Sequence, residues 1–323
     1  MKKEPLVIIA GPTASGKSSL GIALAKRIGG EIISADSMQV YRGMDIGTAK
    51  ITMDEMEGIA HHLIDVMEPE EPYNVAAFQQ MAQDAYSGIR QRGHIPILVG
   101  GTGFYIQAFL KGVNFTPTDT DLTYREELMK IAKEDGGPQQ LYDELKEKDP
   151  ASAEAIHPHN VKRVIRALEF YRQTGWELSA HNSEESMRKS PYCFAFFVLT
   201  MDRKKLYDRI ERRVDDMLSA GLASEVIKLK ERGLSREHIS MQGIGYKQML
   251  SFLDGEISYE RAVELIKRDT RRFAKRQLTW FRREKDVIWV DIDTFTDTQE
   301  ILDYMCSRIR EMTLTETKEQ RGQ

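Results

Sequence analysis

Short apolar runs recur along the chain, and the segments between them place apolar residues every three or four positions. Such runs predict strands, and the intervening period predicts amphipathic helices. Strands that alternate with helices are typical of a parallel α/β sheet. The runs are LVIIA, EIISADS, HHLIDV, IPILVGG, CFAFFVLTM and VIWVDI.

Helix boundaries mark the first part of the sheet domain. Residues 18–30 carry a one-sided apolar face and end in two glycines, which stop a helix. A second helix is predicted to open at Asn74, a residue favoured at helix N-termini, and to run to Gly93. Residues 1–115 are therefore expected to form the first part of an α/β core.

The pattern changes over residues 116–190, where charge-rich helical stretches follow one another without a strand-like run. We expect an inserted all-helical lobe here. Residues 191–323 are expected to complete the core and to contain a basic helix that starts near Ser258 and a C-terminal helix.

Composition narrows the class of protein. With 41% apolar and 30% charged residues, the chain is expected to be soluble and globular, and its net charge of −4 means that any basic surface must be local. Cys193 and Cys306 are far apart, which argues against a disulfide framework or a zinc site and fits a reducing compartment. The N-terminal apolar stretch is too short for a signal peptide, and no segment approaches membrane-spanning length. We expect a cytoplasmic protein without a membrane partner, and a monomer by default.

A glycine-rich loop follows the first strand. GPTASGKSS matches G-x-x-x-x-G-K-[ST], in which backbone N–H groups surround phosphate oxygens. The motif predicts that Lys17 reaches the terminal phosphates and that the Ser18 hydroxyl ligates Mg²⁺, while Thr13 places a hydroxyl inside the cradle. The predicted phosphate-binding residues are Gly11, Pro12, Thr13, Ala14, Ser15, Gly16, Lys17 and Ser18.

Three charged residues are candidates to act beside this cradle. Asp36 ends the second strand, so it borders the expected ligand crevice as a turn cap, a Mg²⁺ ligand or a general base. Arg209 and Arg213 are four residues apart on a predicted helix. One or both could reach a pyrophosphate, and a salt-bridged surface pair is an equal alternative.

The fourth apolar run lacks an expected acid. It ends in Gly100, Gly101 and Thr102, where a nucleoside triphosphatase usually carries an aspartate. This absence weakens the case for ATP hydrolysis without excluding phosphoryl transfer. It also raises the alternative of a substrate with two phosphates.

Basic residues gather late in the chain. Between Arg268 and Lys285, eight Lys or Arg residues stand against two acidic ones, and apolar residues share one helical face. Like charges at this spacing repel each other, so the run favours contact with a nucleic-acid backbone over a merely solvated face. Residues 162–166 form a second basic cluster, and QGIGYK offers glycines for close backbone approach and Tyr246 for stacking on a base.

Five segments together resemble the tRNA dimethylallyltransferases, also called tRNA isopentenyltransferases. They are GPTASGKS, SADSMQVYRGMDIGTAK, LVGGTGFY, QGIGYKQM and AKRQLTWFR, in that order, and they span nearly the whole chain. The resemblance implies a P-loop NTPase-like parallel sheet core with an inserted all-helical lobe. It also implies transfer of a dimethylallyl group from dimethylallyl diphosphate to N6 of the adenosine just 3′ of the anticodon, with release of diphosphate.

Site roles follow from the same resemblance. Asp36 would be the general base, Thr13 would bind the bridging oxygen of the donor, and Lys17 with Arg213 and Mg²⁺ would stabilise the leaving pyrophosphate. The anticodon stem-loop of tRNA would be the macromolecular partner. The implied tRNA-binding residues are Asp36, Ser37, Met38, Gln39, Thr102, Arg125, Lys162, Arg163, Val164, Ile165, Arg166, Gln242, Gly243, Ile244, Gly245, Tyr246, Lys247, Lys275, Arg276, Gln277, Leu278, Thr279, Trp280, Phe281 and Arg282.

Two alternatives use the same motifs. A small-molecule or nucleoside kinase would use the loop for ATP and Asp36 as a base toward a hydroxyl, and would form ADP. An ATP-regulated RNA-binding protein would use the basic helix for binding and yield no modified product.

Overall fold

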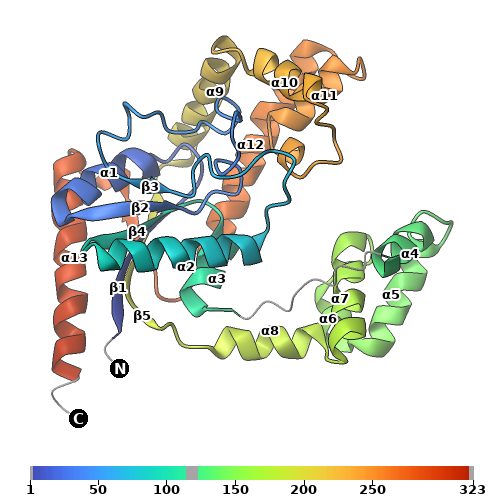
Figure 1. Ribbon diagram of the computed structural model, residues 1–323, viewed down its shortest axis with the longest axis horizontal. Coiled ribbons are helices and arrows are strands. Elements are labelled where there is room, and N and C mark those ends of the chain that lie inside the picture. Colours follow the sequence, from blue (N-terminus) through green and yellow to red (C-terminus); the bar gives the residue numbers. More distant parts are fainter. Residues whose placement is uncertain (1–2, 114–122, 320–323) are drawn as a thin grey trace. The chain divides into compact units, whose positions relative to one another are not determined.

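The computed structural model describes residues 3–113 and 123–319, and it divides into two compact units. One unit comprises Met1–Leu110 and Pro191–Gln323, and the other comprises Lys111–Ser190. Figure 1 shows the sheet in the first unit and helices in the second. The boundary expected at residue 116 lies outside the described residues.

A six-stranded parallel sheet forms the centre of the larger unit, which confirms the predicted fold class. The strand order is β3-β2-β4-β1-β5-β6, so β2, β3 and β4 lie on one side of β1, and the chain then crosses to add β5 and β6 on the other. In such sheets a ligand crevice lies at the carboxyl ends of the strands where this direction reverses. The strands are β1 (Glu4–Ala10), β2 (Gly30–Ser34), β3 (His61–His62), β4 (Ile95–Gly100), β5 (Tyr192–Thr200) and β6 (Ile288–Asp291).

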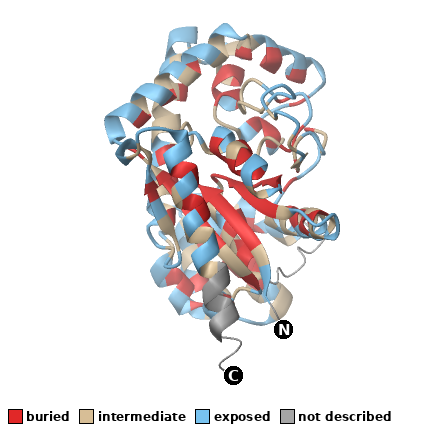
Figure 2. Ribbon diagram, turned by 90° about the vertical axis from the view of Figure 1, so that its left-hand side faces the viewer, coloured by how far each residue is buried: buried red, intermediate tan, exposed pale blue. Residues whose placement is uncertain are grey.

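Side chains of the central strand alternate between two hydrophobic cores, because successive residues of a strand point to opposite faces. Leu6 and Ile8 belong to one core, and Val7 and Ile9 belong to the other. Figure 2 shows the strands as the most continuously buried part of the chain. Both faces of the sheet are therefore covered, as expected for apolar runs without polar alternation.

Different helices cover the two faces. The core of Val7 and Ile9 packs against α1 (Lys17–Ile28) and α13 (Thr298–Glu319). The core of Leu6 includes residues of the remaining helices of this unit. These are α2 (Val75–Gln91), α3 (Gly103–Lys111), α9 (Arg203–Ser219), α10 (Leu222–Glu231), α11 (Tyr246–Leu253) and α12 (Tyr259–Phe281), with short 3₁₀ turns at Ser240–Gln242 and Ile292–Thr294.

Two predicted helix starts are confirmed by their caps. The Asn74 side chain accepts hydrogen bonds from the backbone N–H groups of Ala76 and Ala77 at the start of α2. The Ser258 hydroxyl accepts one from the backbone N–H of Arg261 at the start of α12. Each cap satisfies N–H groups that the first helical turn cannot pair internally.

The second unit is helical throughout its described residues. Its own hydrophobic core includes Leu128, Leu141, Leu145 and Leu168. The helices are α4 (Thr123–Ile131), α5 (Gly137–Lys148), α6 (Pro150–Ala155), α7 (Val161–Thr174) and α8 (Leu178–Met187). Within the part of the chain that the structure describes, no helix is both long and apolar enough to span a bilayer.

Candidate active site

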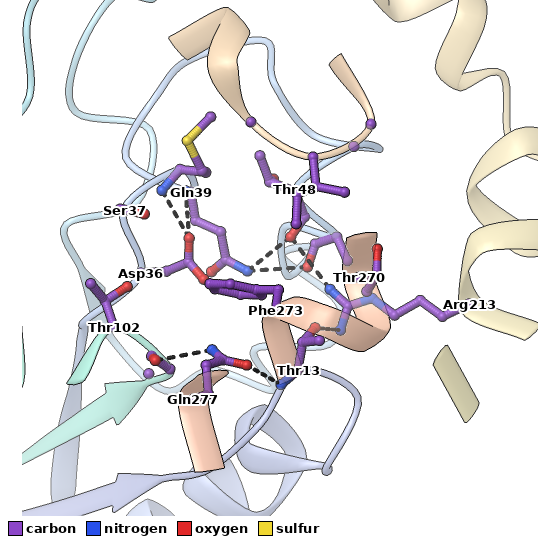
Figure 3. Close-up of a pocket in the computed structure, with 18 of the residues that line it drawn as sticks. Thr13, Asp36, Ser37, Gln39, Thr48, Thr102, Arg213, Thr270, Phe273 and Gln277 are labelled. Atoms are coloured by element: carbon purple, nitrogen blue, oxygen red, sulfur yellow. Dashed lines mark hydrogen bonds between the residues drawn. The ribbon is translucent and has the colours of Figure 1, made fainter. Parts of the chain in front are cut away.

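A pocket of about 440 Å³ opens at the carboxyl ends of the strands in the larger unit. It is lined by the phosphate loop, by the segments after β2 and β4, and by α9 and α12. Figure 3 shows Asp36 and Thr102 on one side of this pocket and Thr48 and Arg213 on the other. The four motif regions expected to act together therefore meet in one cavity, together with the 242–247 segment.

Lys17 begins α1 and lines the pocket. Its ammonium donates a hydrogen bond of 2.7 Å to the carbonyl oxygen of Pro12. Burial, reinforced by the nearby Arg213 cation, lowers the pKa of Lys17 from 10.5 to about 7, against the opposing attraction of Asp36. Two cations held close together in a cavity favour a multiply charged anion between them.

Arg213 is the arginine of its pair that reaches the pocket, which resolves the alternative left open by the sequence. Its guanidinium donates to the Thr13 hydroxyl at 3.4 Å and to the Thr48 carbonyl at 3.5 Å (Figure 3). Burial lowers the pKa of Arg213, and Asp36 opposes that effect. Arg209 is exposed and lies near Asp293 instead.

Asp36 is held by the backbone of its own turn. Its Oδ1 atom accepts hydrogen bonds from the backbone N–H groups of Met38, at 2.8 Å, and Gln39, at 3.3 Å. The cap role considered for Asp36 is thus present, and it fixes the carboxylate at the pocket wall. The Gln39 amide is engaged within the protein, since it donates to the carbonyls of Thr48 and Ala49 (Figure 3).

The two glycines at the end of β4 are closely packed. The buried Gln277 amide donates to the Gly101 carbonyl at 2.9 Å, and its oxygen accepts from the Thr13 N–H at 2.8 Å. A Cβ atom added at Gly101 would lie 2.1 Å from this amide, and one at Gly100 would lie 2.3 Å from the Ala35 carbonyl oxygen. A side chain at Gly100 would therefore meet backbone and one at Gly101 would displace Gln277, whereas Thr102 already carries a side chain that lines the pocket.

Several predicted tRNA-contact side chains face inward. The Tyr246 ring is 1% exposed and its hydroxyl donates to Glu225, so the ring is largely covered by the protein, and its stacking on a base stays a prediction. Gln277 and Phe281 are also buried under the sheet edge. Burial likewise takes Val164 and Ile165 into the core of the helical unit, because they lie on the apolar face of α7.

The charged residues predicted for the helical unit lie on its surface. Lys162 and Arg163 are exposed in the first turn of α7, and Arg166 is half-buried. Arg125 makes a bidentate ion pair with Glu169, at 2.7 and 2.8 Å, so its guanidinium is already engaged. Contact between these residues and tRNA stays a prediction.

The basic run along α12 separates into two parts. In the first part, Lys267 pairs with Asp215 and Arg271 pairs with Glu211. In the second part, five exposed cations have no ion pair with the described acidic residues. These are Lys275, Arg276, Arg282, Arg283 and Lys285, and Arg276 also lines the pocket.

An apolar wall of the pocket was missed by the sequence argument. Ile210, Val214 and Met217 line it from α9, and Ile266 and Phe273 line it from α12. The spacing of the α9 residues, four and then three positions, places them on one face together with Arg213. This spacing in the sequence could have predicted an apolar pocket wall beside Arg213.

Oxygen ligands for Mg²⁺ are present in the pocket. The Ser18 hydroxyl and the Asp36 carboxylate both line it, and Mg²⁺ favours oxygen donors completed by water and substrate phosphates. Among the described residues no cluster of three or more His, Cys, Asp or Glu side chains could bind a metal by itself. The donor set fits an ion held mainly through a bound diphosphate.

Comparisons with known proteins agree with this geometry. The sequence matches the family described as IPP transferase over residues 39–284 and the family described as isopentenyl transferase over residues 4–68. It is 55% identical over 308 residues to a tRNA dimethylallyltransferase of Lachnoclostridium phytofermentans, covering 95% of this chain and 98% of that protein. A tRNA dimethylallyltransferase of Pelotomaculum thermopropionicum is 50% identical, covering 93% of this chain and 95% of that protein.

Solved structures show the same relationship. The full-length tRNA isopentenylpyrophosphate transferase of Bacillus halodurans is 47% identical with a TM-score of 0.74, covering 98% of this chain and 100% of that one. A eukaryotic dimethylallyltransferase acting on tRNA is 33% identical with a TM-score of 0.77, covering 89% of this chain and 74% of that one. This chain therefore belongs to the IPP transferase family, the family of the tRNA dimethylallyltransferases.

Proposed function

We propose that this protein transfers the dimethylallyl group of dimethylallyl diphosphate to N6 of the adenosine 3′ of the anticodon in tRNA and releases diphosphate. The observation that carries this proposal is the pocket itself. Lys17, Arg213 and Thr13 converge there, Asp36 stands across the cavity, and Gly100, Gly101 and Thr102 occupy the place of a nucleotidase acid. This arrangement suits release of an intact diphosphate.

The cations serve the leaving group. As the allylic C–O bond breaks, negative charge grows on the diphosphate, and donors fixed beforehand around it lower the barrier. Lys17 and Arg213 supply positive charge, and the hydroxyl of Thr13 lies within reach of the Arg213 guanidinium. We propose that Thr13 hydrogen-bonds the bridging oxygen and that the apolar wall from α9 and α12 holds the five-carbon chain.

Asp36 serves the acceptor. The N6 amine is a weak nucleophile because its lone pair is delocalised into the purine ring, so removal of its proton must accompany attack. Two backbone N–H groups donate to Oδ1 of Asp36, so its other carboxylate oxygen is the one proposed to accept that proton. The target adenine must leave the stacked anticodon loop to reach this wall, at a cost of roughly a few kcal/mol that backbone contacts must offset.

Ser18 is the residue that would hold Mg²⁺ beside the diphosphate. When bound, the ion would neutralise part of the diphosphate charge. The exposed cations of α12 and α7 are proposed to contact the RNA backbone, which carries one negative charge per nucleotide.

The decisive test uses undermodified tRNA, Mg²⁺ and labelled dimethylallyl diphosphate, with γ-labelled ATP in a parallel reaction. We expect label to enter RNA without ATP, and digestion to nucleosides to place it on the adenosine 3′ of the anticodon. Transfer of the γ-phosphate alone would indicate a kinase. Binding of tRNA without any labelled product would indicate an RNA-binding protein.

A further inference from the structure

Glu225, on α10, is a carboxylate with 9% of its surface exposed and four hydrogen-bond donors around it. Its Oε2 atom accepts from the backbone N–H groups of Asp45, at 2.9 Å, and Ile46, at 2.7 Å. Its Oε1 atom accepts from the N–H of Gly47, at 3.0 Å, and from the hydroxyl of Tyr246, at 2.6 Å. Three successive peptide groups thus point at one side chain.

These contacts fix the shape of the segment that carries them. A buried carboxylate is costly unless its lone pairs are satisfied, and charged hydrogen bonds are the strongest of their kind. Burial raises the pKa of Tyr246, and the negative charge of the nearby Glu225 raises it further. The Tyr246 hydroxyl therefore keeps its proton and donates it to the hydrogen bond. A Cβ atom on Gly47 would lie 2.5 Å from the Tyr246 ring, so this packing requires glycine there.

The next residue of the segment faces the pocket. The carbonyl of Thr48 accepts from the Arg213 guanidinium at 3.5 Å and from the Gln39 amide at 3.3 Å. Arg213 in turn donates to the Thr13 hydroxyl at 3.4 Å, as Figure 3 shows. Contacts run without a break from Glu225, through residues 45–48, to the cation beside the phosphate loop.

We propose that Glu225 is a positioning residue, which orients Arg213 toward the diphosphate by holding residues 45–47. Glu225 stands behind the pocket wall that Gly47, Thr48 and Tyr246 form, so its effect passes through the Thr48 carbonyl. The proposal rests on the proposed function only in identifying the anion as the diphosphate of the donor.

The test measures binding of inorganic pyrophosphate with Mg²⁺ by calorimetry for Glu225→Gln, Arg213→Gln and the double variant. Glutamine turns one acceptor into a donor that faces the backbone N–H groups, so we expect binding to weaken roughly tenfold. The double variant should bind no more weakly than Arg213→Gln, because Glu225 acts through that arginine. Glu231→Gln, an exposed change at the end of the same helix, is the matched control and should bind as the wild type does.

Steady-state kinetics give a second measurement. We expect Glu225→Gln to lower kcat and to leave KM for tRNA unchanged. Losses of pyrophosphate affinity that multiply in the double variant would overturn the proposal, because they would show that Glu225 acts independently of Arg213. Equal losses for pyrophosphate and tRNA would also overturn it, since they would indicate general damage to the fold.

Tyr246→Phe tests the same positioning role if Glu225→Gln does not fold. This change keeps the ring against Gly47 and removes one donor to Glu225, so a loss of roughly threefold in pyrophosphate affinity is expected, again absent on the Arg213→Gln background. Unchanged affinity in Tyr246→Phe would count against the proposal. Pyrophosphate binding is measured without tRNA, so this result is independent of whether the protein prenylates RNA.

Discussion

The pocket and the second part of the basic run both concentrate positive charge, but the cations are buried in the pocket and exposed to solvent in the basic run. Lys17 and Arg213 are held inside a cavity, with lowered pKa values and fixed hydrogen-bond partners. Lys275 and Arg282 stand in solvent on the second part of the basic run. Charges in a low-dielectric cavity act at short range on chosen atoms, whereas exposed charges act on a whole polyanion and are screened by salt.

This difference predicts a division of labour. Charged groups of the pocket should control rate, and exposed cations of α12 should control affinity for tRNA. The first part of α12 supplies an internal reference, because its cations are similar in type and already paired with acidic residues. The experiments below test this division, from the largest expected effect to the smallest.

Asp36→Asn should produce the largest effect. Asparagine retains an oxygen that can cap the turn at Met38 and Gln39 and loses the ability to take a proton. Single-turnover transfer should fall by about 10²–10⁴-fold with tRNA affinity retained. Asp36→Ala, which removes the cap as well, separates the two roles. A near-normal rate for Asp36→Asn would exclude a base role, and a large loss of tRNA affinity would assign Asp36 to recognition.

Lys17→Met should slow transfer by roughly 10²–10³-fold, the cost of removing one donor that stabilises developing charge. The variant should leave tRNA affinity unchanged, since Lys17 lies in the pocket. Lys26→Met, on the exposed side of the same helix, is the control. Equal losses of rate and tRNA affinity would contradict the division of labour.

The pKa of Lys17 adds a pH signature. In the free protein this pKa is lowered to about 7, and the negative charge of a bound diphosphate raises it again. Between about 7 and the ordinary value of 10.5, donor binding should therefore take up a proton, and affinity should fall as pH rises. Calorimetry of dimethylallyl diphosphate binding at pH 8, in buffers of different ionisation enthalpy, measures this uptake. No proton uptake in the wild type, or equal uptake in Lys17→Met, would argue against it.

Removing exposed charge from the second part of the basic run, at the end of α12 and just beyond it, should have the smallest effect on rate and a clear effect on salt dependence. The triple change Lys275→Gln, Arg282→Gln and Arg283→Gln should reduce the slope of log affinity against log salt by about two, at roughly 0.7 per lost phosphate contact.

The matched control for that experiment changes Lys267, Arg268 and Arg271 to glutamine. These cations are paired with acidic residues in the first part of the helix, so a smaller change of slope is expected. Equal slopes for the two triple variants would show that the second part of α12 is no more than a solvated surface.

The strands and the phosphate loop were predictable because their signals are local. LVIIA followed by GPTASGKSS predicts a strand, a glycine-rich turn and a helix within a short stretch, and the structure has each. Asn74 and Ser258 marked helix starts for the same reason, since a cap acts within one turn.

Side-chain direction was harder to predict. Tyr246 stands in a glycine-rich segment that suits a ligand site, yet a distant carboxylate on α10 draws its hydroxyl inward. Gln277 belongs to a basic run, but it links the phosphate loop to the strand end at Gly101. Partners 21 to 264 residues away leave no local pattern.

The sequence by itself determined the order of strands and helices along the chain, the phosphate cradle, and the motifs shared with one transferase family. Only the tertiary structure decided which arginine of α9 enters the pocket, what packs against the glycines that end β4, and which cations of the basic run stay without acidic partners among the described residues. Secondary structure follows from neighbours in sequence. Burial and charge pairing depend on residues that the fold brings together.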